Sequence, residues 1–410
     1  MKKDFQVHTE HYWVPEFNLM PEIQDKLNIP DKVKIYELCL REGDQTPGVV
    51  LRAEEKIAMA RELDKYGVYD IEIFPAVSQD DFEALKEISS WQDRKFETSG
   101  LARFVVNDID RVAEAGADRV MIEGPMSLAI ASHMLGITDE NKIIAKFVDS
   151  VKYAQSLGLK VSAEPWDIGK SNWNFIERFY KTLADTGIDQ AIFADTYNNL
   201  MPWTVYAMVK QIYAWTENQM IIVPHFHNDY GMALASTMAA VAAGSTIIHS
   251  ALNSVGEKAG NTSTEEAAVV LEVLMGVETG IDLSMTDHIT KKYEAISKLA
   301  IPSSKAVTGS RIHELGSGIA ADMFYKSTSD YDRPIQFPFY PSLIGAQEPR
   351  IVWGKGCGAK MVTELAGKMG ITLDKAQADA VRDQVKAESL LRKALLKEYE
   401  VEQMIRNIVK

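Results

Sequence analysis

The chain has 410 residues and a formal net charge of −14, with a pI near 5.2. This acidic balance argues against nucleic acid or an anionic membrane as the main partner, although a local basic patch can still bind an anionic cofactor. The two cysteines form neither a disulfide framework nor a zinc-binding pattern. No apolar run reaches ~18 residues, and the first residues lack a signal-peptide stretch. We therefore expect a soluble cytoplasmic protein with no membrane segment.

Residues 1–31 read as an N-terminal extension in which three prolines break any long element. Its aromatic side chains, Tyr12, Trp13 and Phe17, are expected to pack on a partner surface. This extension is one reason to expect a homodimer.

From Lys34 onward, short apolar runs alternate with helical stretches that end at glycine. A glycine at that point adopts the left-handed conformation that ends a helix, and the next residues enter a strand. The glycines concerned are Gly67, Gly116, Gly158, Gly187 and Gly244. The pattern predicts eight strands, near residues 34–40, 69–74, 96–104, 119–123, 160–164, 190–195, 220–227 and 246–252.

Eight alternating βα units predict an α/β fold in which a parallel sheet closes into a (β/α)8 TIM barrel. No Gly-x-Gly-x-x-Gly run follows the first strand, which disfavours a dinucleotide-binding fold. The alternation of strands and helices stops near residue 282. We therefore predict a catalytic barrel over 32–282 and a helical, subunit-contacting accessory domain over 283–410. Its tail, residues 373–410, is expected to form two amphipathic helices, whose apolar faces are Ala378, Val381 and Val385 in the first and Leu395, Tyr399, Met404 and Ile408 in the second.

Two histidines near the end of the seventh strand, His225 and His227, are the strongest candidates for a metal site. Their i, i+2 spacing points both imidazoles to one side of a strand. Glu42, after the first strand, is the natural carboxylate ligand, although an Arg-Glu-Gly turn is also common in surface loops. Asn261 offers an amide oxygen, or caps the helix that follows it. A carboxylate, an amide and two imidazoles can hold one divalent metal.

Further charged residues lie at the predicted strand ends. Arg41 can hold a developing oxyanion beside a metal, or form an ion pair with Glu72 or Glu164. Those two carboxylates can act as a general base and its orienting group, because burial raises a carboxyl pKa toward working pH. They can equally serve a structural role.

Two residues are candidates for binding the substrate. Thr196 can bind a carboxylate or cap the sixth helix. Arg103 points to a second carboxylate on the substrate, or pairs with Glu72 or Glu123. His249, with three other histidines, has no assigned role.

Five segments form one joint pattern. Residues 40–48 (LREGDQTPG) and 225–229 (HFHND) carry the arginine, carboxylate and histidines, and the other segments are Ile71–Pro75, Val161–Trp166 and Asn253–Asn261. Together they resemble the signature motifs of the DRE-TIM metallolyase superfamily, and within it the Claisen-condensing group of isopropylmalate, homocitrate and citramalate synthases.

The resemblance implies an acyltransferase that uses a divalent metal (Mg²⁺, Mn²⁺, Zn²⁺ or Co²⁺) to condense an acyl-CoA, acetyl-CoA first among them, with a 2-oxo acid. The product would be a 2-hydroxy-2-alkyl dicarboxylic or tricarboxylic acid and CoA. The implied metal ligands are Glu42, His225, His227 and Asn261. The implied catalytic residues are Arg41, Glu72 and Glu164, and the predicted substrate-binding residues are Arg41, Gln45, Arg103 and Thr196. The resemblance also implies a shared active site in a homodimer, and no feedback through a C-terminal regulatory domain.

Two departures from the family pattern bear on this expectation. Glu42 stands where the family has a shorter aspartate. Ala320 stands where the family has a catalytic histidine, and alanine cannot transfer a proton; His313 lies nearby in the sequence but not at the matching place.

Two alternatives remain open. One is a metal-dependent carbon–carbon lyase of the hydroxymethylglutaryl-CoA lyase or aldol type, which Ala320 favours. The lack of a cysteine in the glycine-rich segment Ser254–Gly260 disfavours it. The other alternative is a non-catalytic descendant that binds a ligand or a partner.

Overall fold

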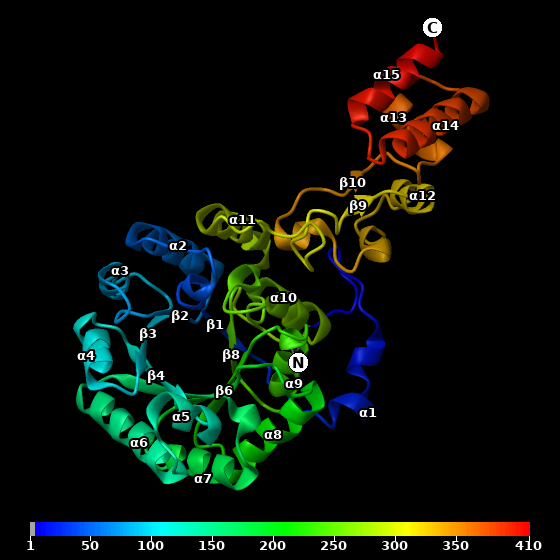
Figure 1. The fold of residues 1–410 in the computed structure, drawn as a ribbon. Coiled ribbons are helices and arrows are strands. Elements are labelled where there is room, and N and C mark those ends of the chain that lie inside the picture. The colour runs from blue at the N-terminus through cyan, green and yellow to red at the C-terminus, as the bar shows by residue number, and fades with distance from the viewer. Residues whose placement is uncertain (1–4) are drawn as a thin grey trace. The chain divides into compact units, whose positions relative to one another are not determined.

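The structure is a computed structural model that describes residues 5–410. Its first part is built on eight parallel strands, which follow the order β7-β6-β5-β4-β3-β2-β1-β8 around the sheet. Since β7 and β8 also contact each other, the sheet is nearly closed, and the predicted (β/α)8 barrel is confirmed (Figure 1). The strands are β1 (Lys34–Glu37), β2 (Asp70–Ile73), β3 (Glu97–Arg103), β4 (Arg119–Pro125), β5 (Lys160–Trp166), β6 (Gln190–Asp195), β7 (Ile221–Phe226) and β8 (Ile247–Ser250).

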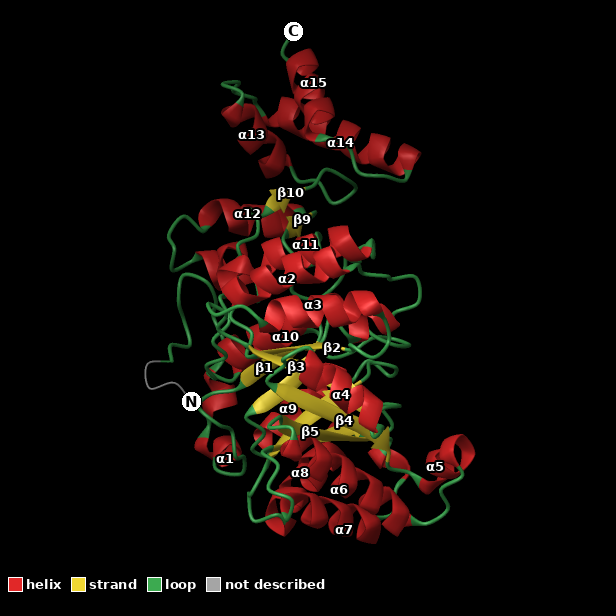
Figure 2. Ribbon diagram, turned by 90° about the vertical axis from the view of Figure 1, so that its left-hand side faces the viewer, coloured by secondary structure: helices red, strands yellow, loops and turns green. Residues whose placement is uncertain are grey.

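Helices surround the strands, so the sheet is covered on its outer face (Figure 2). They are α2 (Ala53–Tyr66), α3 (Gln79–Ser89), α4 (Val106–Glu114), α5 (Leu128–Leu135), α6 (Glu140–Ser156), α7 (Trp173–Ala184), α8 (Pro202–Trp215), α9 (Ala233–Ala242) and α10 (Thr264–Val269). Strand β6 is buried along its whole length, as expected of a parallel strand covered on both sides. The helix-ending glycines have positive φ, as at Gly67 (98°) and Gly187 (76°), a conformation that glycine adopts without strain.

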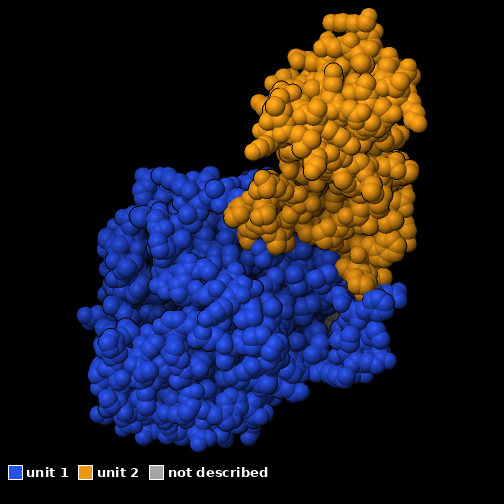
Figure 3. All heavy atoms as spheres, turned by 45° about the vertical axis from the view of Figure 1, so that its right-hand side comes forward, with its two compact units in different colours: residues 1–5, 16–301 blue, residues 6–15, 302–410 orange. Residues whose placement is uncertain are grey.

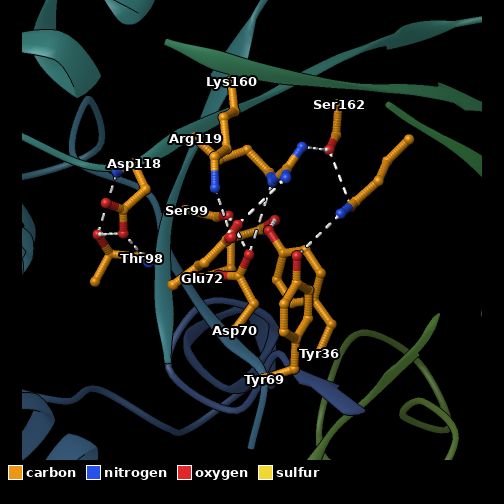
Figure 4. Close-up of polar contacts among 12 residues, drawn as sticks. Tyr36, Tyr69, Asp70, Glu72, Thr98, Ser99, Asp118, Arg119, Lys160 and Ser162 are labelled. Carbon is orange, nitrogen blue, oxygen red and sulfur yellow. Dashed lines mark hydrogen bonds and ion pairs between the residues drawn. The ribbon is translucent and has the colours of Figure 1, made fainter. Parts of the chain in front are cut away.

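A polar cluster fills the barrel interior near the strand starts (Figure 4). Arg119, the first residue of β4, is fully buried. Its guanidinium donates to Asp189 at 2.7 Å, to Ser162 at 3.1 Å and to Glu97 at 3.2 Å. Ser99 donates to the buried Asp70 at 2.9 Å. The buried charge is therefore paired within the barrel, as burial of a guanidinium requires.

The chain divides into two compact units (Figure 3). Unit 1 holds residues 16–301, and so includes α11 (Thr286–Ser297) with the barrel; Phe5 is grouped with it. Unit 2 holds residues 6–15 and 302–410. The division into an extension, a barrel and an accessory domain stays a prediction.

Unit 2 is mainly helical. Its helices are α12 (Gly318–Lys326), α13 (Ala359–Lys368), α14 (Lys375–Arg392) and α15 (Glu398–Ile408), and two short strands, β9 (Glu314–Leu315) and β10 (Arg350–Ile351), pair in parallel. Val401 and Ile405 of α15 are fully buried, whereas Leu395 and Tyr399 are 56% and 54% exposed. The apolar face expected for the second tail helix is therefore wrong at Leu395 and Tyr399, because α15 begins only at Glu398 and packs through the i, i+4 pair that starts at Val401, whereas Met404 and Ile408 pack against the same core as expected. The face expected for the first tail helix is buried in α14, at Ala378, Val381 and Val385.

In residues 5–410, none of the helices combines the length and the apolar character needed to cross a membrane. In the N-terminal segment, Trp13 stacks on His8 with ring centroids 4.4 Å apart and remains 51% exposed. Phe17 is 72% exposed. The expected partner contact of these aromatic side chains stays a prediction.

Candidate active site

The carboxyl ends of the strands open into a cavity of about 320 Å³ in unit 1. Sites of barrel enzymes lie at this end, because loops from several strands meet there. The cavity is lined by Arg41, Glu42, Gln45, Glu123, Glu164, Trp166, Thr196, Tyr197, His225, His227, Glu257 and Lys258. Seven of these residues were expected at a site from the sequence, and they come from the ends of β1, β5, β6 and β7.

Glu42, His225 and His227 form a candidate metal centre. A ligand atom of each lies within 4.8 Å of the other two, and all three residues are buried. Nε2 of His225 is 3.8 Å from Oε1 of Glu42. One carboxylate and two imidazoles so close together can converge on a single divalent cation.

The protonation states of this group suit a cation. Burial lowers the pKa of His225 to about 3 and also lowers the pKa of His227. Burial by itself would raise the pKa of Glu42, but the charge of Arg41, the two neighbouring histidines and a backbone hydrogen bond from Glu257 together outweigh it, and the pKa is lowered to about 2. At neutral pH the imidazoles are neutral and the carboxylate is ionised, which are the forms that bind metals.

Asn261 lies beside this group. It is 2% exposed, and neither its amide oxygen nor its amide nitrogen has a hydrogen-bond partner among residues 5–410. An isolated antiparallel bridge pairs its backbone with His227. A Cβ at Gly256 would lie 3.0 Å from the amide nitrogen, so glycine there leaves room for the side chain. A buried amide without partners is costly unless a ligand satisfies it, and this supports Asn261 as a further donor.

The turn that carries Glu42 is held in place by a contact with α11. Tyr293 of α11 donates a hydrogen bond of 3.0 Å to the backbone carbonyl of Cys39. A Cβ at Gly43 would lie only 2.2 Å from that hydroxyl oxygen. Glycine after Glu42 therefore allows α11 to brace the turn, which fixes the backbone of the candidate ligand.

Arg41 connects the metal centre to the neighbouring carboxylates. Its Nε donates to Glu72, and its Nη1 donates to Glu42 and, at 3.4 Å, to Gln45. Its Nη2 lies 3.6 Å from Glu164 and has no hydrogen-bond partner among the residues that the structure describes. Arg41 therefore forms ion pairs with the neighbouring carboxylates and still has N–H groups on Nη2 that can donate to a ligand. Glu72 is fully buried and also accepts a hydrogen bond of 2.9 Å from Tyr36.

Two further carboxyl groups face the cavity with perturbed acidity. Burial and the charges of Glu72 and Glu123 raise the pKa of Glu164 well above its ordinary value, although Arg41 opposes this. Burial likewise raises the pKa of Glu123 to about 7. A carboxyl group with a pKa near neutrality, such as Glu123, is suited to proton transfer.

The residues predicted to bind the substrate differ in whether they reach the cavity. Thr196 lines the cavity, and its hydroxyl oxygen accepts a hydrogen bond of 2.9 Å from the backbone of Asp167. Arg103 does not line the cavity. Its guanidinium forms two hydrogen bonds, of 2.6 and 3.0 Å, to Asp108 in the first turn of α4, and its side chain is 57% exposed. The pair with Glu72 or Glu123 that the sequence left open is not the one formed.

Some cavity residues carried no role in the sequence interpretation. They are Glu123, Trp166, Tyr197, Glu257 and Lys258. Glu123 was visible only as one of several polar residues at strand ends. In the structure the register of β4 and β5 pairs Glu123 with Glu164. The sequence itself offered only the position of Glu123 at the end of a predicted strand.

The fold is a nearly closed (β/α)8 barrel, and a histidine–carboxylate cluster lies beside a buried arginine at the ends of its strands. These two features place the chain among barrel proteins with a candidate metal centre at that end. The HMGL-like family model matches residues 32–292, and the chain belongs to that family. It is 34% identical to a putative (R)-citramalate synthase of Methanopyrus kandleri over 87% of this chain and 69% of that protein. It is 30% identical to a homocitrate synthase of Methanothermobacter thermautotrophicus over 92% of this chain and 93% of that protein. The predicted place in the Claisen-condensing synthase group is confirmed.

Among solved structures, the chain is similar to hydroxymethylglutaryl-CoA lyase from Pseudomonas aeruginosa. The TM-score is 0.60 at 18% sequence identity, over 67% of this chain and 96% of that one. At this identity the likeness shows the barrel fold alone.

Proposed function

We propose that this protein is a divalent-metal-dependent synthase that condenses an acyl-CoA, acetyl-CoA first among them, with a 2-oxo acid. The products are a 2-hydroxy-2-alkyl dicarboxylic or tricarboxylic acid and CoA. The observation that carries the proposal is the convergence of Glu42, His225 and His227 beside Arg41 in one cavity. This combination suits a reaction in which a keto oxygen gains negative charge. Curated relatives named as synthases, which align over most of the chain, support the reaction type.

Glu42, His225 and His227 would hold the metal, with the amide of Asn261 as a further donor. A divalent ion bound there would act as a Lewis acid on the keto oxygen of the 2-oxo acid. The donor set suits Mg²⁺, Mn²⁺, Zn²⁺ and Co²⁺. The amide of Asn261, which has no hydrogen-bond partner in the part of the chain that the structure describes, is the feature that best supports a fourth ligand position.

Arg41 stabilises negative charge on the reacting oxygens. Glu72 and Glu42 fix its Nε and Nη1, so the guanidinium keeps one orientation. The N–H groups of Nη2 are then left to donate to an enolate or alkoxide oxygen. A preorganised cationic donor of this kind contributes about 10²–10³-fold to a rate.

Glu164 acts as the base. In its ionised form it accepts a proton from the carbon next to the thioester carbonyl, and that carbon then forms a bond to the keto carbon of the 2-oxo acid. The π electrons of the keto group move to its oxygen, which is then protonated to give the 2-hydroxyl group of the product. Water afterwards cleaves the thioester, which releases the CoA thiol and a new carboxylate. The raised pKa of Glu164 makes it a stronger base than an ordinary glutamate.

Thr196 and Gln45 orient the 2-oxo acid. Because the oxygen of Thr196 already accepts from the backbone of Asp167, its hydroxyl hydrogen is directed to another acceptor, and a substrate carboxylate fits that need. Gln45 lines the same cavity. Arg103 is bound to Asp108, so Lys258, which lines the cavity, is the better candidate to bind a second carboxylate.

Glu123 takes over proton transfer in place of the family histidine. Ala320 lies in α12, where its backbone N–H donates a hydrogen bond to the side chain of the N-cap residue Ser317, and its methyl group cannot carry a proton. Glu123 lines the cavity next to Glu164 on the neighbouring strand, and its pKa is raised by burial to about 7.

The protein is further proposed to work in the cytoplasm as a homodimer. The aromatic side chains of Trp13, in unit 2, and Phe17, in unit 1, are each exposed, and each supports a partner contact. Light scattering is expected to give twice the chain mass of 45.7 kDa, and a monomeric mass across the accessible concentration range would contradict the dimer.

The test of the reaction is metal-dependent release of free thiol from acetyl-CoA. The purified protein, stripped of metal and then reloaded with each of the four ions, is offered pyruvate, oxaloacetate, 2-oxoglutarate or 2-oxoisovalerate. Thiol release with at least one acceptor, lost in Glu42→Gln, is expected. No release with any acceptor, together with cleavage of a 3-hydroxyacyl-CoA, would reverse the assignment in favour of a lyase.

A further inference from the structure

His249 is a buried histidine of β8 that has no part in the proposed reaction. It is 1% exposed. Its Nδ1 lies 3.1 Å from Nδ1 of His225, a hydrogen-bonding distance, and the two rings are nearly perpendicular at 85°. One of the candidate metal ligands is therefore bonded, on its far side, to another imidazole.

A single hydrogen can lie between the two Nδ1 atoms, so only two neutral arrangements exist. In the first, His225 carries its hydrogen on Nδ1 and donates it to His249. In the second, His249 donates, and the hydrogen of His225 then lies on its Nε2. The two arrangements differ in which nitrogen of His225 keeps a free lone pair.

Nε2 is the nitrogen of His225 that faces the cavity. It lies 3.8 Å from Glu42 and 4.0 Å from Glu164. A metal can bind only a ring nitrogen without hydrogen, so a metal at the Glu42 cluster requires the first arrangement. His249 must then accept at Nδ1 and carry its own hydrogen on Nε2.

We propose that His249 is a positioning residue that accepts the Nδ1 hydrogen of His225 and so fixes the tautomer and the ring orientation of that metal ligand. The proposal rests on the metal site of the proposed function. Metal-bound histidines usually donate their other nitrogen to a carboxylate, a carbonyl or water; here a second histidine takes that place.

The surroundings of His249 hold its ring in place. Tyr36 packs against it edge to face, with centroids 4.4 Å apart and planes at 67°. Nε2 of His249 has no hydrogen-bond partner among residues 5–410. The ring therefore has one polar contact, and that contact is the one to His225. The same Tyr36 bonds Glu72, the partner of Arg41, so one tyrosine touches the supports of both the metal ligand and the arginine.

The experiment compares His249→Asn with His249→Leu. The two replacements have the same branched skeleton, but only asparagine places an acceptor oxygen at the δ position that Nδ1 occupies. Metal-free proteins are titrated with Zn²⁺ and with Mn²⁺ by calorimetry, and thermal unfolding without metal reports whether each variant folds. His249→Leu is expected to bind about 10- to 100-fold more weakly than the wild type, and His249→Asn within about threefold of it.

Several outcomes overturn the inference. One is a metal affinity of His249→Leu equal to that of the wild type. Another is an equal loss of metal affinity in both variants when both are folded, which would assign the effect to packing. A second measurement does not depend on the variants: ¹⁵N chemical shifts of the metal-free wild type should show His225 protonated on Nδ1. Protonation of His225 on Nε2 refutes the inference. If the wild type itself binds none of the ions, the metal site of the proposed function fails, which is a distinct result.

Discussion

The contact between Gly43 and Tyr293 provides a direct test of how the Glu42 turn is held. In Gly43→Ala the new Cβ would lie 2.2 Å from the Tyr293 hydroxyl oxygen, while its next contacts, at 3.5 and 3.6 Å, are ordinary. An ordinary contact begins near 3.4 Å, so the turn or α11 must move by about 1.2 Å, the difference between these two distances. Overpacking of this kind costs about 1–3 kcal/mol. Because Glu42 precedes Gly43, metal affinity should fall as well.

Tyr293→Phe removes the atom responsible for this clash. Alone it loses the hydrogen bond to Cys39, which costs about 1 kcal/mol. In the double variant the alanine meets only ring carbon, so its stability and metal affinity should return close to those of Tyr293→Phe. Thermal unfolding of the metal-free proteins and calorimetric metal titration measure both quantities. Additive effects of the two substitutions would refute the reasoning.

Three further predictions follow from other buried groups. Asn261→Ala should leave the metal-free protein as stable as the wild type or slightly more so, because it removes unpartnered polar atoms, yet weaken metal binding about tenfold or more by calorimetry; a large loss of stability without metal would contradict this. Burial raises the pKa of Glu37 from 4.5 to about 7, which corresponds to about 3 kcal/mol. Its contribution is fully present below pH 4.5 and is lost as pH rises through 7, so urea midpoints of the wild type should fall between pH 5 and 8 more steeply than those of Glu37→Gln. Arg119→Met should destabilise the barrel by about 1–3 kcal/mol, because Asp189, Ser162 and Glu97 would lose the hydrogen bonds of its guanidinium; a change below about 0.5 kcal/mol in thermal unfolding would count against that role.

The candidate metal centre was predictable because its pattern is local. Side chains two residues apart on a strand point to the same face, so the spacing alone predicted that the imidazoles of His225 and His227 lie together. Glu42 and Arg41 required only the inference of a barrel, in which strand ends converge. The residues that the sequence could not assign depend on contacts between strands distant in the chain: His249 on its distance to His225, and Glu123 on its register with Glu164.

By itself the sequence determined the repeating βα units, the barrel that they build, and the residues available for a metal and an oxyanion, because helix-ending glycines and strand periodicity act over a few residues. Only the tertiary structure decided how those side chains are divided among partners. It bound Arg103 to Asp108 rather than to the cavity, left Nη2 of Arg41 without a hydrogen-bond partner among residues 5–410, and placed His249 against His225. These choices depend on distances of 3–4 Å between segments far apart in the chain, and such distances are fixed only when the barrel is packed.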